Sequence, residues 1–292
     1  MYIKGVYIHD TFAEAFALYG TRFIITAANR KWALQAAQSV TGFATSIIGC
    51  GCEAGIEGEV SATPDDRPGV AVLLFATSFQ ELEKQLLARL GQCVMTCPTT
   101  ACYNGLASDG QLQVGGKLRY FGDGWQASKV IAGQRYWRIP VMEGEFLIQE
   151  SFGYCKGVGG GNFLLLGTDD QLTLAAATKA VEAMEKVAGV IMPFPGGIVR
   201  SGSKVGSRYK SLLASTNTAY CPSLRGRVES ALPSKVNSVL EIVIDGLDLA
   251  AVEEATRVGI RAACEPGIVQ ITAGNYGGKL GQYKIQLRSV LE

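Results

Sequence analysis

The chain has 292 residues, of which 48% are hydrophobic and 18% charged, so it can bury a large core in one or two globular domains. Its 27 Lys and Arg residues nearly balance its 26 Asp and Glu residues, which gives no indication of nucleic acid or a membrane surface as partner and favours a small-molecule ligand. No apolar run reaches the roughly 20 residues of a membrane span, and the N-terminal MYIKGVYIHD lacks the apolar region of a signal peptide. We therefore expect a cytosolic protein.

The cysteines and the single histidine restrict the chemistry. The eight cysteines are scattered, and neither Cys50-Gly-Cys52 nor the Cys93 to Cys97 spacing gives the C-x₂-C pairs of a structural zinc site, so reduced thiols are expected. His9 is the only histidine and lies near a terminus. A histidine-containing metal centre or a Ser-His-Asp triad is therefore not predicted, and we predict no metal site.

The first half of the chain predicts two strand–helix–strand units. In the first unit, strand 23–26 leads through a helix to strand 45–48. In the second, strand 70–75 leads through a helix with a stripe of Leu82, Leu86 and Leu90 to strand 92–95. Ser78 and Glu81 match a capping box at the start of that helix, and Gly91 is expected to end it.

The second half predicts two more units of the same kind. Strand 162–166 precedes a helix whose apolar face carries Leu174, Ala177, Val181 and Met184, followed by strand 190–192. A strand from Leu240 then precedes a helix with Glu253 and Arg257 paired on its exposed face, followed by strand 268–271.

Two such units in tandem give the βαββαβ order of the ferredoxin-like fold. The sequence therefore predicts an α+β protein of two tightly packed ferredoxin-like lobes, residues 1–150 and 151–292, without a low-complexity linker between them. Residues 110–150 alternate short strand-like runs with glycine turns and predict a β-meander at the end of the first lobe. The third and fourth units begin about 30 residues farther apart than the first two, so residues 193–238 form a long Gly-rich insertion in the second lobe.

The insertion opens with MPFPGGIVRSGSKVGSRYK, residues 192–210, which nearly matches a P-loop. Gly197 and Gly202 have the P-loop spacing, but Ser203 stands where the lysine is needed and Lys204 follows it. Ile198 and Val199 also favour extended backbone, so a nucleotide site is not predicted. The cations of this stretch are either a solvated basic face or a docking site for carboxylate or phosphate groups.

Glu241 interrupts the apolar strand VLEIVID. On a two-residue period, Leu240, Ile242 and Ile244 point to one face, while Glu241 points to the other between Val239 and Val243. Partial desolvation there would raise the pKa of Glu241 and make it a general acid near neutral pH. The alternative is an exposed or salt-bridged strand glutamate.

Two further glycine-rich segments flank predicted strands. Residues 157–162 precede a strand, which is the wrong order for a dinucleotide fingerprint, and indicate close backbone packing or a ligand-facing turn. Residues 273–281 follow the last strand and either present backbone amides to a ligand or form plain turns.

At these segments the sequence closely resembles the formylmethanofuran:tetrahydromethanopterin formyltransferase family. The stretches that carry the resemblance extend along almost the whole chain: DTFAEAF (10–16), TGFATSII (41–48), CEAGIE (52–57), RPGV (67–70), GQCVMTCPTTA (91–101), GGNF (160–163), PFPGGIVRSGSKVGS (193–207), EIVIDGL (241–247) and AGNYGGKLGQY (273–283). The resemblance implies a two-lobe α+β fold, a homodimer or homotetramer, and chemistry without a bound cofactor. Tetrahydromethanopterin and methanofuran-type carriers are then substrates.

Three features resemble the bacterial branch of methylotrophs more than the archaeal branch: Cys50-Gly-Cys52, the segment 118–125 and Arg200. That branch implies a subunit of a formyltransferase/hydrolase complex with a metal-bearing partner subunit. The chain would move a formyl group between N5 of the pterin carrier and the amine of the furan carrier, in one-carbon metabolism. A non-catalytic assembly or carrier-docking subunit is the alternative.

By resemblance Glu241 is the catalytic acid. Transfer between two nitrogens passes through a tetrahedral intermediate without a covalent enzyme adduct, and oxyanion donors are expected near the formyl group. Eight residues are expected to bind substrate: Arg200, Ser203, Lys204, Arg208, Thr216, Asn217, Asn275 and Tyr276. The cations among them suit glutamate-type carrier tails.

Overall fold

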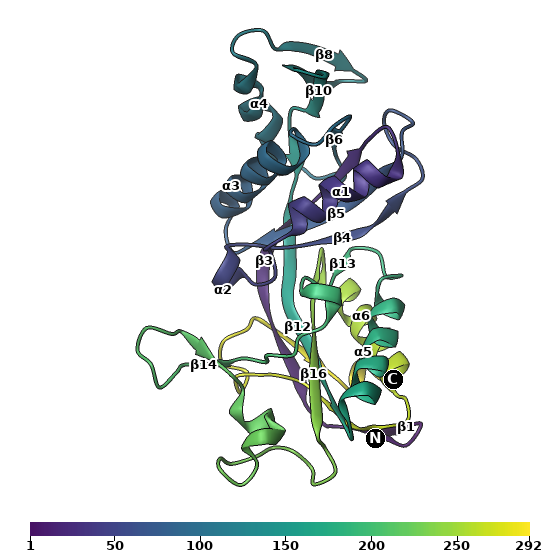
Figure 1. Ribbon diagram of the computed structural model, residues 1–292, viewed down its shortest axis with the longest axis vertical. Helices are drawn as coiled ribbons and strands as arrows, with labels where there is room; N and C mark the ends of the chain where they lie inside the picture. The colour runs from purple at the N-terminus through teal and green to yellow at the C-terminus, as the bar shows by residue number, and fades with distance from the viewer.

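Two long strands, β3 (Phe12–Thr26) and β12 (Cys155–Gly167), run antiparallel through the molecule and join its two lobes (Figure 1). The computed structural model describes all 292 residues. The two strands pair with each other from Phe16 to Gly20 of β3 and from Cys155 to Gly159 of β12. Beyond this stretch each strand continues into the sheet of a different lobe, so a single sheet spans the molecule.

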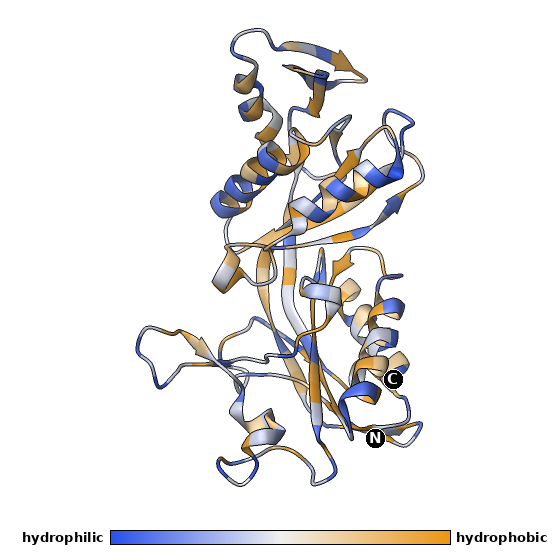
Figure 2. Ribbon diagram, viewed as in Figure 1, coloured by the Kyte–Doolittle hydropathy of each residue, from blue (hydrophilic) through white to orange (hydrophobic).

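The first lobe has four antiparallel strands in the order β4, β5, β3, β6. Its elements are β4 (Glu53–Val60), β5 (Gly69–Ala76) and β6 (Ala101–Asn104), with helices α1 (Arg30–Thr41) and α3 (Phe79–Arg89). The polar residues of both helices form a stripe away from the sheet (Figure 2). Their apolar faces join a core of 25 buried residues that includes all three leucines of the predicted stripe.

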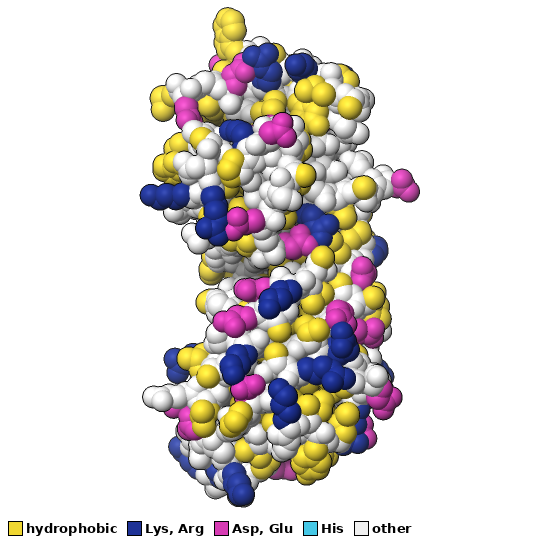
Figure 3. All heavy atoms as spheres, turned by 90° about the vertical axis from the view of Figure 1, so that its right-hand side faces the viewer, with side chains coloured by type: hydrophobic (Ala, Val, Ile, Leu, Met, Phe, Trp, Pro, Cys, Tyr) yellow, Lys and Arg dark blue, Asp and Glu magenta, His cyan; other side chains and the backbone are white.

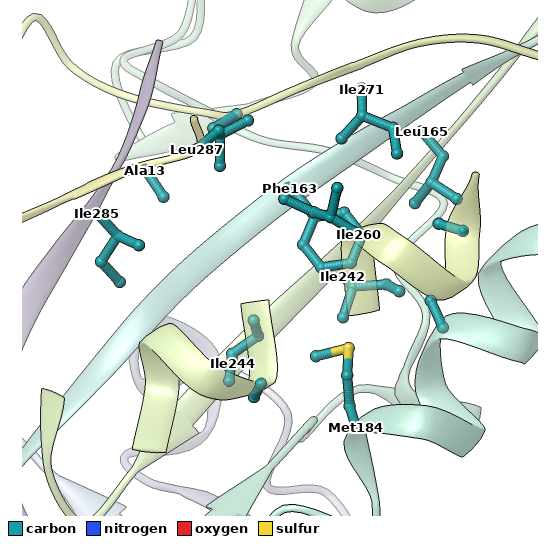
Figure 4. Close-up of a cluster of buried hydrophobic side chains, with 14 of the residues drawn as sticks. Ala13, Phe163, Leu165, Met184, Ile242, Ile244, Ile260, Ile271, Ile285 and Leu287 are labelled. Atoms are coloured by element: carbon teal, nitrogen blue, oxygen red, sulfur yellow. The ribbon is translucent and has the colours of Figure 1, made fainter. Parts of the chain in front are cut away.

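The second lobe repeats this arrangement with β13, β16, β12 and β17, again all antiparallel. Its elements are β13 (Val190–Ile191), β16 (Ser238–Gly246) and β17 (Ile268–Thr272), and α5 (Asp170–Met184) and α6 (Leu249–Ala263) cover one face of the sheet (Figure 1). Phe163, Ile242, Ile244 and Met184 meet in its core of 26 buried residues (Figure 4).

Both ends of the chain belong to the second lobe. After β1 (Tyr2–Ile3), β2 (Val6–Ile8) adds a parallel strand to β17, and β18 (Tyr283–Gln286) pairs with the N-terminal half of β3 before the last turn, η6 (Ser289–Leu291). The chain therefore begins in the second lobe, crosses to the first along β3 and returns along β12.

Two strands predicted in the first lobe were wrong. Residues 45–48 enter the short helix α2 (Ile47–Cys50), closed by left-handed Gly51, and the strand is β4, which begins eight residues after the predicted start. Residues 92–95 continue α3 as a π-helical turn, η1 (Leu90–Val94), which buries Leu90 and Val94 completely, and the strand is β6. Gly91 does not end the helix because tertiary packing of these side chains outweighs its low helix propensity.

Three smaller predictions on the helices also need correction. Ser78 caps α3 by accepting from the Glu81 amide at 3.2 Å, but the Glu81 carboxylate contacts Lys84 and Gln85 instead of completing the box. Leu174 is 52% exposed, outside the buried face of α5. Arg257 pairs with Glu254 one turn away and not with Glu253, because its guanidinium reaches both oxygens of that carboxylate.

The predicted meander was right for only part of residues 110–150. Strands β8 (Ala127–Ile131), β9 (Gln134–Val141) and β10 (Gly144–Gln149) form it, and β10 joins β6 in parallel. The preceding residues contain β7 (Gln111–Leu112), which pairs with β11 (Phe152–Gly153), then α4 (Val114–Leu118) and the 3₁₀ turn η2 (Arg119–Gly122).

The insertion lies between β13 and β16. It contains the turns η3 (Pro195–Gly197), η4 (Thr218–Tyr220) and η5 (Pro222–Leu224) and a hairpin of β14 (Lys204–Val205) and β15 (Ala214–Ser215). Ile198 and Val199 are extended, and Val199 bridges Glu241 of β16 by two backbone hydrogen bonds of 2.7 and 2.9 Å. The hairpin, residues 201–217, projects from the second lobe as an arm (Figure 1).

The eight cysteines are free thiols. No helix combines the length and apolar character needed to cross a membrane. On the face shown in Figure 3, basic and acidic side chains are intermixed.

Candidate active site

A cavity of about 710 Å³ lies on the face of β16 that is turned away from α5 and α6. Ser46, Ile47, Ile48, Glu53 and Thr77 contribute its wall from the first lobe. The second lobe contributes residues of β3, β12 and β16, the insertion, and the segment that follows β17. The cavity therefore lies where the lobes meet, beside the crossing of the two long strands.

Glu241 lines this cavity on the side opposite the second core. Ile242 and Ile244 are fully buried against the helices, whereas Glu241 and Val243 face the cavity, which confirms the alternation predicted for β16. Burial raises the pKa of Glu241 to about 7. Because the side chain makes no ion pair and desolvation is the cause, a large fraction is protonated near neutral pH.

The Gly-rich segment 273–281 wraps around the carboxylate of Glu14. The Glu14 carboxylate oxygens accept hydrogen bonds from the backbone N–H groups of Tyr276 at 2.7 Å, Gly278 at 2.9 Å, and Leu280 and Gly281 at 2.5 Å. Burial acts to raise the pKa of Glu14, but these four amides together lower it to about 2. A permanently ionised Glu14 thus fixes the segment along the cavity wall.

Two asparagines fix the start of the same segment. Asn162 accepts from the Gly274 amide at 2.6 Å and donates to the Gly274 carbonyl at 3.2 Å. Asn275 donates to Thr11 Oγ1 at 3.2 Å and to the Phe12 carbonyl at 3.1 Å. Asn162 and Asn275 both line the cavity, so side-chain amides and backbone amides surround the same space.

The glycines of β12 serve close packing and the cavity wall together. A β-carbon at Gly159 would lie 2.2 Å from Leu18 Cδ1, and one at Gly161 would lie 2.6 Å from a methyl group of Val252. Gly160 has φ +79° in a bulge of the strand, and Gly159 and Gly160 line the cavity.

The structure brings six of the nine predicted site residues together. Glu241, Ser203, Lys204, Asn217, Asn275 and Tyr276 line the cavity. Burial raises the pKa of Tyr276, and the nearby charges of Glu241 and Glu14 raise it further.

The other three predicted residues, Arg200, Arg208 and Thr216, are exposed and do not line the cavity. Thr216 contacts the Ser201 carbonyl and Cys221 at 3.5 Å. They lie on the arm or beside its base, so only Lys204 among the predicted cations reaches the cavity wall.

Sequence reasoning missed His9, Glu14, Glu53 and Asn162, which all line the cavity. His9 is exposed, as its place near the N-terminus predicts, yet it lines the cavity with its Nδ1 atom 3.0 Å from Thr272 Oγ1. Glu14 interrupts an apolar strand as Glu241 does, and that signal could have identified it. Nothing local in the sequence indicates that Glu53 faces the second lobe.

No three His, Cys, Asp or Glu side chains lie together in a metal-binding arrangement. The site instead offers a protonatable carboxyl group, hydrogen-bond donors fixed in a wall of backbone and side-chain amides, and room for a large organic ligand. These groups can donate a proton to a departing atom and hold an oxyanion.

A two-lobed α/β architecture with such a cavity at the lobe boundary is typical of an enzyme that binds a bulky organic substrate. The family model described as formylmethanofuran-tetrahydromethanopterin formyltransferase matches residues 1–141, and the model described as its proximal lobe matches residues 144–290. The chain belongs to this formyltransferase family.

Named relatives match this chain along almost its full length. The formylmethanofuran–tetrahydromethanopterin formyltransferase of Methylococcus capsulatus is 57% identical over 297 residues and covers both chains completely. A relative from Methylorubrum extorquens, named as a subunit of a formyltransferase/hydrolase complex, is 53% identical, covering 99% of this chain and 97% of the relative.

Solved structures have the same fold. The formyltransferase from Methanosarcina barkeri superposes with a TM-score of 0.95 at 49% identity, covering 99% of this chain and 100% of the other. A chain of the formyltransferase/hydrolase complex from Methylorubrum extorquens, solved with methylofuran, gives 0.97 at 52% identity, covering 100% and 99%.

Proposed function

We propose that this chain transfers a formyl group between N5 of tetrahydromethanopterin and the amine of a methanofuran-type carrier, with Glu241 as general acid. The observation that carries the assignment of Glu241 is its place in the cavity with a pKa near 7. An acid works best when its pKa lies near the operating pH, because it is then both protonated and able to release the proton.

The reaction proceeds by attack of one carrier's amine nitrogen on the formyl carbon held by the other. The tetrahedral intermediate carries an oxyanion, and the departing nitrogen must receive a proton before the carbon–nitrogen bond breaks. Glu241 donates this proton and takes it back from the attacking amine by the end of the cycle. Asn217 and Ser203 are the cavity side chains with donors free for this role, because both amide protons of Asn275 are already donated to Thr11 and Phe12. Each oxyanion donor is worth about 3 kcal/mol of transition-state stabilisation.

Lys204 is the cation placed to hold a carboxylate of a carrier tail at the cavity rim. Its ammonium group donates to Thr218 Oγ1 at 3.1 Å, so the side chain is held along the insertion. Arg200 and Arg208 bind tails only beyond the cavity rim, along the arm.

The first test is Glu241→Gln, which keeps the shape and removes the acid. We expect kcat for formyl transfer to fall by about 10²- to 10⁴-fold, while the dissociation constant of each carrier changes less than about threefold. The assay follows spectroscopic conversion of N5-formyl-tetrahydromethanopterin. The matched control is Glu229→Gln on the exposed surface of the insertion, which should retain full activity. Unchanged turnover in Glu241→Gln would falsify the assignment.

The alternative, an assembly subunit without activity, predicts partner binding but no conversion of the carrier by the purified chain. A partly buried, protonatable glutamate in a cavity surrounded by amide donors favours the catalytic function, since an inactive subunit has no use for the desolvation of Glu241.

We also propose that the chain forms a homodimer or homotetramer and joins other subunits, one of them metal-bearing, in a formyltransferase/hydrolase complex in the cytosol. The name of the Methylorubrum extorquens relative supports the complex. Four large apolar side chains of the arm are at least half exposed, Val205, Tyr209, Leu212 and Leu213, and support an interface there.

For the lobes, we infer two ferredoxin-like units, since each contains the order βαββαβ with two helices. We keep 1–150 and 151–292 as their boundaries, with the N-terminal strands packed on the second unit.

A further inference from the structure

Two carboxyl groups from different lobes meet beside the cavity and have no part in the chemistry assigned to Glu241. Glu53 begins β4 in the first lobe, Asp245 lies near the end of β16 in the second, and the two side chains are in hydrogen-bonding contact. Asp245 is completely buried and Glu53 is 9% exposed. No cation is among the groups that shift the pKa of either one.

The hydrogen bonds around the pair require a shared proton. Asp245 Oδ1 accepts from the Gly160 amide at 2.9 Å, and Glu53 Oε1 accepts from the Ile47 amide at 3.1 Å. Asp245 Oδ2 is buried, and no N–H or O–H group of the protein donates to it. Two carboxylates here would repel each other with no cation to neutralise them and only one amide donated to each, whereas one proton converts the contact into an O–H···O bond. Burial raises the pKa of both groups, and the charge of Glu53 raises that of Asp245 further.

The pair holds three segments of the cavity wall. Ile47 belongs to the wall of the first lobe and Gly160 to the bulge of β12. The Gly160 carbonyl accepts from Asn162 at 3.1 Å, and Asn162 accepts from the Gly274 amide at 2.6 Å. A continuous chain of hydrogen bonds therefore runs from the first lobe through the pair to the Gly-rich segment.

We propose that Glu53 and Asp245 are a positioning pair for formyl transfer, whose shared proton fixes the Ile47, Gly160 and Gly274 walls relative to each other. This inference rests on the proposed function. The pair touches neither the formyl group nor the proton that Glu241 donates; it sets the width of the cavity in which the carriers meet.

The test compares Asp245→Ala with Asp245→Asn. The asparagine can still accept from the Gly160 amide and donate to Glu53, so the hydrogen bonds remain without a titrating proton. The alanine leaves the Gly160 amide and Glu53 without their partner. We expect Asp245→Ala to raise KM for the carriers by about tenfold or more with kcat changed less than about threefold, and Asp245→Asn to restore KM to within about threefold of the wild type. Equal defects in both variants, or no defect in either, would overturn the proposal.

A second readout needs no activity. Hydrogen exchange without carriers should become faster in residues 157–163 and 272–281 of Asp245→Ala and stay as in the wild type in Asp245→Asn. If the wild type transfers no formyl group, the proposed function fails, while this comparison still decides whether the pair holds the walls. Should Asp245→Ala not fold, Glu53→Leu and Glu53→Gln provide the same contrast from the other lobe. Unchanged exchange in Glu53→Leu would then contradict the proposal.

Discussion

Glu14 and Glu241 line the same cavity, yet their pKa values move in opposite directions. Both are desolvated, which by itself raises a carboxyl pKa. Glu14 receives four backbone amides and its pKa falls to about 2, while Glu241 receives no compensating hydrogen bond and its pKa rises to about 7. The count of N–H donors around each carboxylate therefore decides which glutamate is an anchor and which can donate a proton.

The raised pKa of Glu241 carries a stability cost that depends on pH. The side chain is neutral in the fold below pH 7, but it ionises in the unfolded chain near its ordinary value of 4.5. The folded state is therefore favoured least above pH 7, where ionisation must occur in a desolvated site. We expect Glu241→Gln to raise the free energy of unfolding, with a gain that grows from about pH 4.5 and levels off above about pH 7 at about 3 kcal/mol.

Denaturant unfolding of the wild type and Glu241→Gln at a series of pH values measures this difference. Glu229→Gln is the control, since an exposed side chain should leave the difference near zero at every pH. A constant offset between Glu241→Gln and the wild type would mean that packing, and not ionisation, separates them.

Among the elements, β12 connects the lobes to the second core, because it pairs with β3 in one stretch and with β16 and β17 in another. Its N-terminal half is glycine-rich and forms the cavity wall, while its C-terminal half carries the apolar residues of the second core. One strand thus links core stability to the geometry of the site.

Phe163 shows how much the second core depends on this strand. Its ring is completely buried next to Gly259 of α6, where a β-carbon would lie 3.1 Å from it (Figure 4). We expect Phe163→Ala to lower the free energy of unfolding by about 3 to 5 kcal/mol, because it removes a buried ring and leaves a cavity. Leu174→Ala on the exposed face of α5 should change it by less than about 0.5 kcal/mol. Thermal and denaturant unfolding check both values.

At the scale of the whole molecule, the arm is the part whose exposed apolar side chains indicate an interface with another chain. It extends away from the second lobe and exposes Leu213 at 80% and Tyr209 at 72% (Figure 1). Apolar side chains on a projecting hairpin cost solvation free energy unless another surface covers them. The arm also includes Lys204 and Asn217, which line the cavity, so a partner that covered the arm would lie close to the site.

We therefore expect Leu213→Glu to weaken self-association of the chain by at least about tenfold, measured by sedimentation at several protein concentrations. Leu174→Glu, which adds the same charge on α5, is the matched control and should leave the association unchanged. Equal association of Leu213→Glu and the wild type would show that the arm is not the interface between copies.

The sequence by itself determined the repeated strand–helix–strand units of the second half, the insertion between β13 and β16, and the face on which Glu241 lies. These follow from local periodicity, because a two-residue alternation indicates a strand and an apolar stripe at helical spacing indicates a helix. The resemblance to the family then identified the chemistry, and both family models agree with it.

Only the tertiary structure decided where the walls of the cavity come from. Strand β4 begins with Glu53 instead of lying at 45–48, and this places a carboxyl group against Asp245 of the other lobe. Likewise, the four amides around Glu14 belong to residues more than 260 positions away. Periodicity describes neighbours along the chain, whereas the burial and hydrogen bonding that set these pKa values depend on contacts between distant segments.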